Sequence, residues 1–230
     1  MTGFKRPKLL AQTVLDHLRN LIVQGDLKLG EAISERQLAE RLQVSKTPVR
    51  EALAQLRSEG LVQIFPQKGA FVFTLGGDEV AKLCDFRLPI EIAAAKLACQ
   101  RDLHGVRDEL AKVVCEMRDA LSRGDTRAYL DLDTAFHSVF LNHCGNPYLV
   151  DTYKRFAGKI AALRTHLAVK PFHTKLSMQE HEEILESLDG GSITQTINIL
   201  SHHIDRTRVT YSVGVHDIAA ADFVDVGKAS

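Results

Sequence analysis

The chain has 230 residues, of which 45% are hydrophobic and 25% are charged, and its formal net charge at pH 7 is zero. This is an ordinary globular composition, and the length suits two domains that each bury a core. No apolar run is long enough to span a bilayer, the first residues lack the apolar region of a secretory signal, and the four cysteines form no Cys-x-x-Cys pair. A membrane anchor, a secreted disulfide framework and a zinc knuckle are therefore excluded, and we expect a protein of the reducing cytoplasm.

The charges are unevenly distributed along the chain. Residues 1–74 hold 11 Lys and Arg against 7 Asp and Glu, a net charge of +4, whereas the remainder holds 18 against 22, a net charge of −4. A basic head on an acidic body suits one module that meets phosphate and another that does not. Nine of the ten histidines lie in the acidic part.

The first 60 residues predict three helices. Leucines and other apolar residues recur at helical spacing over residues 9–24, which end at Gly25. Ser34-x-x-Gln37 is a capping box that opens a short helix through residue 42. The next helix begins within residues 45–48, with Thr47 as its cap and Pro48 as its first residue, and it ends at Gly60. Two helices joined by so short a turn predict a helix-turn-helix, whose second helix enters the major groove of DNA.

A small hairpin follows the helix-turn-helix. Residues 61–65 and 70–74 predict two short strands, which are joined by Pro66-Gln67-Lys68-Gly69. This hairpin is the expected wing.

Several exposed residues of this head are candidates for contact with DNA. At the start of the second helix, Ser45, Lys46 and Thr47 present donors to phosphates. Arg50 lies one turn further and can form two hydrogen bonds to a guanine. Arg36 can reach the same groove or its phosphate edge, and Lys68 and Gly69 at the wing tip suit the minor groove or the backbone. The alternative is that these are solvated charges on a winged-helix domain that binds protein, and composition does not decide between the two.

The residues themselves resemble the DNA-binding domain of the GntR family of regulators over residues 9–74. This resemblance implies that Arg36, Ser45, Lys46, Thr47, Arg50 and Gly69 contact operator DNA. Lys46 replaces a more usual arginine, which favours a phosphate contact there. The matching residues are Gly30, Ile33-Ser34-Glu35-Arg36, Leu38-Ala39, Val44-Ser45-Lys46-Thr47-Pro48-Val49-Arg50-Glu51-Ala52-Leu53, Leu56, Glu59-Gly60-Leu61-Val62, Gly69 and Val72.

The rest of the chain predicts helices only. A short linker at residues 75–77 precedes helices at 78–100, 105–123, 125–143, 147–168, 175–189 and 192–213, which with their short connections form an antiparallel bundle. We therefore expect a mostly α protein with three parts: a winged helix-turn-helix domain (1–74), an all-helical domain (78–213), and a loosely held tail (214–230).

An aspartate and several histidines of this bundle have the pattern of metal ligands. Asp133 and His137 lie one turn apart on a face with apolar neighbours, so both point inward. His181 and the pair His202-His203 follow on the last two helices. An Asp and three His suit a first-row transition metal, but partly buried histidines paired with carboxylates explain the pattern equally well.

The same region resembles the FCD effector domain of FadR-type GntR regulators over residues 78–210. The matching pieces are Arg87-x-x-x-Glu91, Asp133-x-x-Phe136-His137, Gly145-Asn146-x-x-Leu149, Ser177-x-x-Glu180-His181-x-x-Ile184 and His203-Ile204. The resemblance implies four metal ligands, Asp133, His137, His181 and His203, with His203 preferred over His202 because an apolar residue follows the ligand. It implies a divalent metal, zinc first and nickel or manganese as alternatives, with open positions for a small carboxylate. Arg87 would pair with that carboxylate, and an ion pair with Glu91 is an equal alternative.

The sequence thus predicts a DNA-binding transcriptional regulator of bacterial type, a repressor, that responds to a small carboxylate effector. It would be a homodimer on a palindromic operator, and not an enzyme. A metal-dependent hydrolase is the first alternative, but no His-Glu-x-x-His sequence supplies a general base, and Glu180 is expected to point away from the ligands. A regulator with a purely structural metal is the second.

Overall fold

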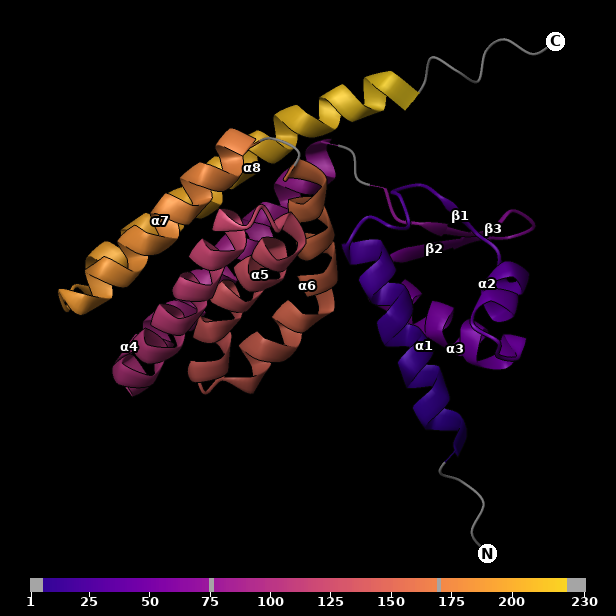
Figure 1. The fold of residues 1–230 in the computed structure, drawn as a ribbon, viewed down its shortest axis with the longest axis horizontal. Coiled ribbons are helices and arrows are strands. Elements are labelled where there is room, and N and C mark those ends of the chain that lie inside the picture. The colour runs from indigo at the N-terminus through magenta and orange to yellow at the C-terminus, as the bar shows by residue number, and fades with distance from the viewer. Residues whose placement is uncertain (1–5, 75–76, 169–170, 223–230) are drawn as a thin grey trace, which may run out of the picture. The chain divides into compact units, whose positions relative to one another are not determined.

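The computed structural model describes residues 6–74, 77–168 and 171–222 (Figure 1). Its internal contacts divide the chain into two compact units. The first unit contains residues 1–74 and 155–166, and the second contains residues 75–154 and 167–230. Among the described residues, no helix is both long enough and apolar enough to cross a membrane.

The N-terminal part of the first unit is a winged helix-turn-helix. It comprises α1 (Arg6–Val23), β1 (Ala32–Ile33), α2 (Glu35–Arg41), α3 (Lys46–Ser58), β2 (Val62–Phe65) and β3 (Gly69–Val72). The three strands form an antiparallel sheet in the order β1-β3-β2. Its core is built from the apolar stripes of the helices, with Leu18, Ile22, Leu53, Leu56 and Leu61 all buried. The winged helix-turn-helix predicted from the sequence is confirmed.

A local cap explains where α2 begins, whereas the N-cap residue of α3 makes no side-chain capping hydrogen bond. The Ser34 hydroxyl accepts a hydrogen bond from the backbone N–H of Gln37 at 3.3 Å, as the capping box predicts. The start of α3 differs from the expectation: Ser45, not Thr47, is the N-cap, and Pro48 is the third helical residue. Proline is tolerated there because none of the first four N–H groups of a helix has a partner within the helix.

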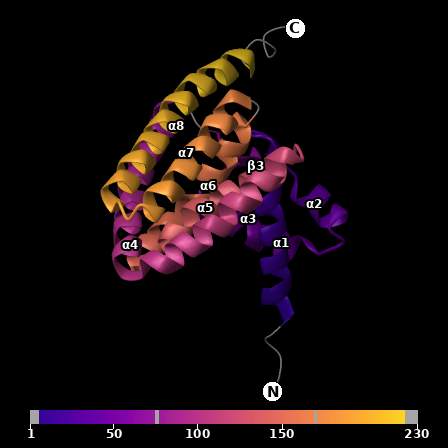
Figure 2. The same cartoon turned by 60° about the vertical axis from the view of Figure 1, so that its left-hand side comes forward.

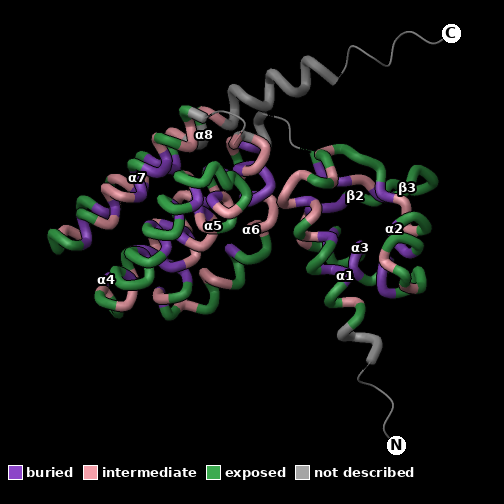
Figure 3. The backbone as a smooth tube through the Cα atoms, viewed as in Figure 1, coloured by how far each residue is buried: buried purple, intermediate pink, exposed green. Residues whose placement is uncertain are grey.

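The second unit is a helical bundle. Its helices are α4 (Gly77–Ser122), α5 (Thr126–His143), α6 (Pro147–Leu167), α7 (Pro171–Asp189) and α8 (Ile193–Asp222), although residues 155–166 of α6 belong to the first unit. α4 packs against α5, α7 and α8, and α7 also lies beside α8 (Figure 2). Figure 3 marks the buried residues along these helices. On α4, Ala94, Ala95 and Ala98 are fully buried, and their small side chains allow close helix packing.

The long helix α4 contains a break. Asp102 has non-helical backbone angles (φ −151°, ψ 61°), and its carboxylate accepts a hydrogen bond from the N–H of Gly105 at 3.0 Å. Asp102 therefore acts as the cap of a new helical segment. This matches the two helices predicted at 78–100 and 105–123.

Two other helix ends differ from the expected ones. α7 begins at Pro171 rather than at residue 175, and α8 continues to Asp222 although a tail was expected from residue 214. The physical reason for the second difference is the alanine run at 219–221, which strongly favours helix once a helix has begun. Residues 223–230 and the linker residues 75–76 lie outside the described residues.

Candidate functional site

Three buried histidines converge inside the second unit. His137 comes from α5, His181 from α7 and His203 from α8, and no more than 2% of any of the three is exposed. One ring nitrogen from each lies within 4.8 Å of the nitrogens of the other two. The Phe136 ring packs on His181, with ring centroids 4.1 Å apart, and helps to exclude water. We call these three residues the histidine cluster.

Asp133 lies at the edge of this cluster. It precedes His137 by one turn of α5 and is buried, and its Oδ1 lies 3.5 Å from Nε2 of His181. The four side chains singled out from the sequence are thus brought together from three helices. In a zinc site each nitrogen would lie about 2.0–2.1 Å from the ion and about 3.4 Å from the next nitrogen. The rings would therefore have to close by roughly an ångström to hold a metal, which small rotamer shifts can provide.

A buried carboxylate from another helix contacts the His137 ring. Glu91 on α4 lies 2.7 Å from Nδ1 of His137, and the Tyr153 hydroxyl donates to the same carboxylate at 2.9 Å. Arg87 forms an ion pair with Glu91 one turn away on α4. Its Nη2 lies 3.0 Å from Nε2 and 3.3 Å from Nδ1 of His137. Arg87 is thus buried at the cluster, and it makes the Glu91 ion pair that the sequence left as an alternative role.

A second buried carboxylate holds His203. Glu180 on α7 lies 2.7 Å from Nδ1 of His203 and accepts a hydrogen bond from Nε of Arg206 at 2.7 Å. Burial alone would raise the pKa of Glu180, but the hydrogen bonds from Arg206 and His203 outweigh it and lower this pKa to about 2. Burial also lowers the pKa of His203. The sequence predicts that Glu180 points away from these histidines, and this prediction is wrong. α8 brings His203 and Arg206 against Glu180.

Other histidines whose side chains the structure describes lie outside the cluster. The side chain of His202 is 74% exposed and 3.5 Å from Glu180, so the structure favours His203 as the member of the cluster. Burial and the neighbouring Arg206 lower the pKa of His173 to about 4, and burial lowers the pKa of His166. His143, at the end of α5, pairs instead with Asp102 and Glu109.

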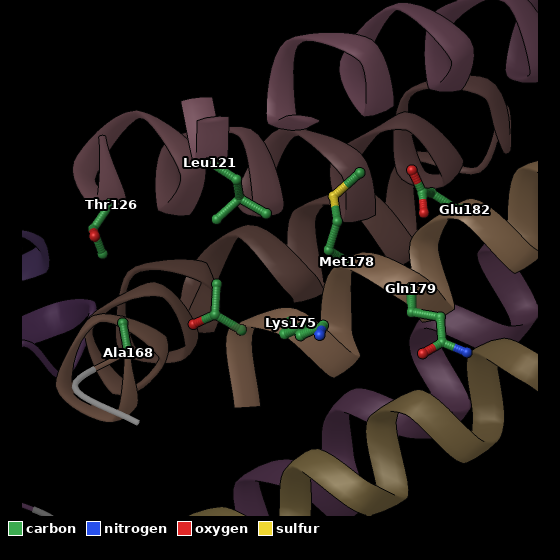
Figure 4. A pocket seen from close by; sticks show the side chains of 8 residues that line it. Leu121, Thr126, Ala168, Lys175, Met178, Gln179 and Glu182 are labelled. Atoms are coloured by element: carbon green, nitrogen blue, oxygen red, sulfur yellow. The ribbon is translucent and has the colours of Figure 1, made fainter. Parts of the chain in front are cut away.

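A surface cleft of about 490 Å³ lies in the second unit and does not include the cluster (Figure 4). Leu121 of α4 and Met178 of α7 supply apolar lining, and Lys175, Gln179 and Glu182 supply polar lining. Arg118 donates to Glu182 at 2.7 Å. The cleft shares α7 with His181, but none of the residues that line it belongs to the histidine cluster.

In the first unit, the residues expected to contact DNA are exposed. They are Arg36, Ser45, Lys46, Thr47, Arg50, Lys68 and Gly69. Arg50 forms an ion pair with Glu35 at 2.6 Å, which joins the first turn of α2 to the first turns of α3. Gly69 has a positive φ of 99° at the end of the wing turn, a conformation that glycine adopts without strain.

Comparison with known proteins decides the family. The model of the bacterial regulatory proteins of the gntR family matches residues 10–72, and the FCD domain model matches residues 82–206, more than half of the chain. The chain belongs to the GntR family and carries an FCD domain. The two matches cover the helix-turn-helix with its wing and the helices that carry the histidine cluster.

Individual relatives agree with this assignment. The GntR protein is 31% identical over 196 residues to an uncharacterized HTH-type transcriptional regulator of Streptomyces ambofaciens. The aligned residues cover 81% of this chain and 78% of the relative. It is 26% identical over 204 residues to the HTH-type transcriptional repressor RspR of Escherichia coli K12, over 86% and 90% of the two chains. A crystal structure of a GntR transcriptional regulator from Rhodococcus sp. RHA1 has the same fold, with a TM-score of 0.78 at 19% identity over 87% and 96% of the two chains.

This GntR protein is therefore a DNA-binding transcriptional regulator and not an enzyme, as the sequence predicted. The structure supplies a set of three histidines that could hold a metal ion. Sequence reasoning did not predict the contacts of the rings with buried carboxylates, above all that of His203 with Glu180, nor the contact of Arg206 with Glu180.

Proposed function

We propose that this regulator is a metal-dependent sensor of a small carboxylate, and that effector binding in the helical unit changes its affinity for operator DNA. The observation that carries the proposal is the convergence of His137, His181 and His203 from three helices, buried and within 4.8 Å of one another. Three imidazoles buried so close together present nitrogen ligands to a single ion, which is the donor type that zinc takes in proteins.

The donor set fits a first-row transition metal. Three imidazoles and the carboxylate of Asp133 would be the protein ligands, and such nitrogen-rich sets favour zinc, with nickel or manganese as alternatives. Four protein ligands on a six-coordinate ion leave positions that a hydroxy acid, a sugar acid or a dicarboxylate could chelate. The metal supplies Lewis acidity toward such an oxygen ligand.

Arg87 is the residue that would recognise the charge of the effector. It is buried beside the cluster, where a guanidinium binds a carboxylate strongly. Glu91 already binds one side of Arg87, so the effector would compete with or share this ion pair. Arg87 and Glu91 lie on α4, the helix that follows the linker from the head, and a shift in α4 packing would change how the heads are presented to DNA.

The DNA-binding unit would act in pairs. Helix-turn-helix regulators bind as dimers whose two recognition helices contact the half-sites of a palindrome, and we propose the same for this chain. RspR, a relative aligned over most of its length, is named a repressor, which supports repression as the outcome of operator binding.

The test is an operator titration with and without acid. Operator DNA is selected from a random library with the purified protein, and its Kd is then measured by fluorescence anisotropy with zinc-loaded protein and a panel of hydroxy acids, sugar acids and dicarboxylates. We expect at least one acid to change the Kd by about tenfold, and its uncharged amide to have no effect. Arg87→Gln should keep the basal Kd and lose the response. Coincident curves for every acid, with and without metal, would contradict the proposal.

A further inference from the structure

In two of the three histidines of the cluster, a buried carboxylate lies against the same ring atom, Nδ1. Glu91 of α4 lies 2.7 Å from Nδ1 of His137 on α5, and Glu180 of α7 lies 2.7 Å from Nδ1 of His203 on α8. Both glutamates are buried, with 1% and 8% of their surface exposed. In each case the carboxylate comes from a different helix than the ring, so the contact depends on the packing of the bundle.

Each of these carboxylates is itself held by an arginine. Glu91 forms an ion pair with Arg87 and also accepts from the Tyr153 hydroxyl at 2.9 Å. Glu180 accepts from Arg206, which also donates to the Ser177 hydroxyl at 3.0 Å. An arginine keeps a neighbouring buried carboxylate ionised, and an ionised carboxylate can only accept hydrogen bonds.

The hydrogen bond fixes the tautomer of each ring. Because the carboxylate accepts, Nδ1 must carry the proton, and a neutral imidazole then has its lone pair on Nε2. Metal-binding histidines are commonly oriented in this way by a carboxylate on the other nitrogen. Arg87 Nη2 is nearly equidistant from the two nitrogens of His137, at 3.0 and 3.3 Å, so it does not lie along the lone pair of either.

We propose that Glu91 and Glu180 are positioning residues, which hold His137 and His203 as Nδ1–H tautomers with Nε2 presented for metal binding. The inference rests on the proposed metal function, and it assigns residues that neither donate to the metal nor contact DNA. It also gives Arg206 a role, which is to fix Glu180 behind His203.

Glu180 is the better residue to test, because Glu91→Gln would leave the buried Arg87 without its ion pair. Glu180→Gln keeps the shape of the side chain and removes its charge. Glu186→Gln is the matched control, since it makes the same change at an exposed position on the same helix. The Zn²⁺ affinity of the full-length protein is measured by competition with a chromophoric chelator at one pH.

We expect the zinc Kd to rise by about 10- to 100-fold in Glu180→Gln and to stay unchanged in Glu186→Gln. Arg206→Met should give a smaller rise, since Glu180 would be present but less well fixed. Equal zinc affinities in wild type, Glu180→Gln and Glu186→Gln would overturn the inference and leave the proposed function intact. Wild-type protein that takes up no zinc would instead contradict the proposed function, and the inference with it.

A second readout separates positioning from a general effect on folding. In metal-free protein labelled with ¹⁵N-histidine, ring nitrogen NMR shifts report which nitrogen carries the proton. We expect His203 to be protonated at Nδ1 in wild type and to shift toward the Nε2–H tautomer in Glu180→Gln. Should Glu180→Gln fail to fold, the wild-type spectrum and Arg206→Met still decide. Wild-type His203 protonated at Nε2 would contradict the inference directly.

Discussion

Arg50 lies near the start of α3 with 65% of its side chain exposed, and its guanidinium has a partner within the protein. It forms an ion pair with Glu35 at 2.6 Å. Glu35 belongs to the first turn of α2, so the pair orients a recognition-helix arginine from the preceding helix. An arginine held in this way can present its remaining N–H groups to the edge of a guanine.

Replacing Arg50 by alanine should weaken operator binding and relax specificity. A bidentate contact to guanine contributes about 1–3 kcal/mol, so we expect the operator Kd to rise by roughly 5- to 150-fold. Affinity for unrelated DNA should fall much less. Arg57→Ala is the control because Arg57 is an exposed arginine in the last turn of the same helix. Equal losses on operator and unrelated DNA would assign Arg50 to a phosphate instead.

At this scale the sequence predicted which histidines come together better than it predicted their surroundings. The Asp133-x-x-x-His137 spacing places both side chains on one face of a helix, and the order of the later histidines follows the FCD pattern. The partners of the rings could not be predicted in the same way, because His203 and Glu180 lie 23 residues apart on helices whose rotation sets their contact. The sequence alone therefore predicts that Glu180 faces away from the histidines, whereas the packing of α8 beside α7 brings His203 to it.

At the scale of elements, His143 joins the end of α5 to the second segment of α4. Its Nδ1 lies 2.7 Å from Asp102 and its Nε2 lies 2.8 Å from Glu109. Burial would lower the pKa of His143, but the hydrogen bonds to Glu109 and Asp102 outweigh it and raise this pKa above 6.5. The hydrogen bond from Gly105, followed by that from His143, lowers the pKa of Asp102, to which nearby His104 also contributes.

The sign of the pH dependence follows from the raised pKa of His143. Its stabilising contribution is complete below about pH 6.5, the unfolded value, and is lost as the pH rises through the folded value. We expect His143→Gln to lower the Tm by roughly 2–4 °C at pH 6 and by much less at pH 9. His17→Gln, at an exposed position on α1, is the control. A Tm difference that does not depend on pH would mean that His143 acts only by packing.

Ser34 tests the capping that positions the helix-turn-helix. Its hydroxyl accepts from the N–H of Gln37, so Ser34→Ala should cost about 1 kcal/mol of unfolding free energy. Ser34→Asp retains an acceptor and should be close to wild type. The measurement is urea denaturation of the three proteins. An alanine variant as stable as wild type would show that tertiary packing alone fixes the start of α2.

The elements themselves were largely predictable, because caps and apolar spacing are local signals. The break of α4 at Asp102 was anticipated as a boundary between two helices. β1 was missed because a two-residue strand has no alternation to detect, and it is defined only by pairing Ala32 with Phe71 and Ile33 with Ala70. The helical residues after 213 were not predicted because residues 214–230 show no strong periodic pattern.

At the scale of the whole molecule, the chain is neutral, but residues 1–74 have a net charge of +4. Operator binding should therefore weaken as salt rises, since phosphate contacts release counterions. Lys46→Ala should reduce the slope of log Kd against log salt by about 0.9 for each copy bound. Lys112→Ala, an exposed lysine of the acidic helical unit, should leave the slope unchanged. Equal effects of the two substitutions would place Lys46 away from the DNA.

The central claim is that the histidine cluster is a metal site, and the metal content of the purified protein tests it most directly. Wild type and His181→Ala are purified without added chelator and analysed by mass spectrometry for transition metals, with circular dichroism to confirm folding. The account predicts one transition-metal ion per chain in wild type and its loss in folded His181→Ala. No metal in wild type, even after incubation with zinc, nickel or manganese, would contradict the claim and return His137, His181 and His203 to the role of core residues in a DNA-binding regulator.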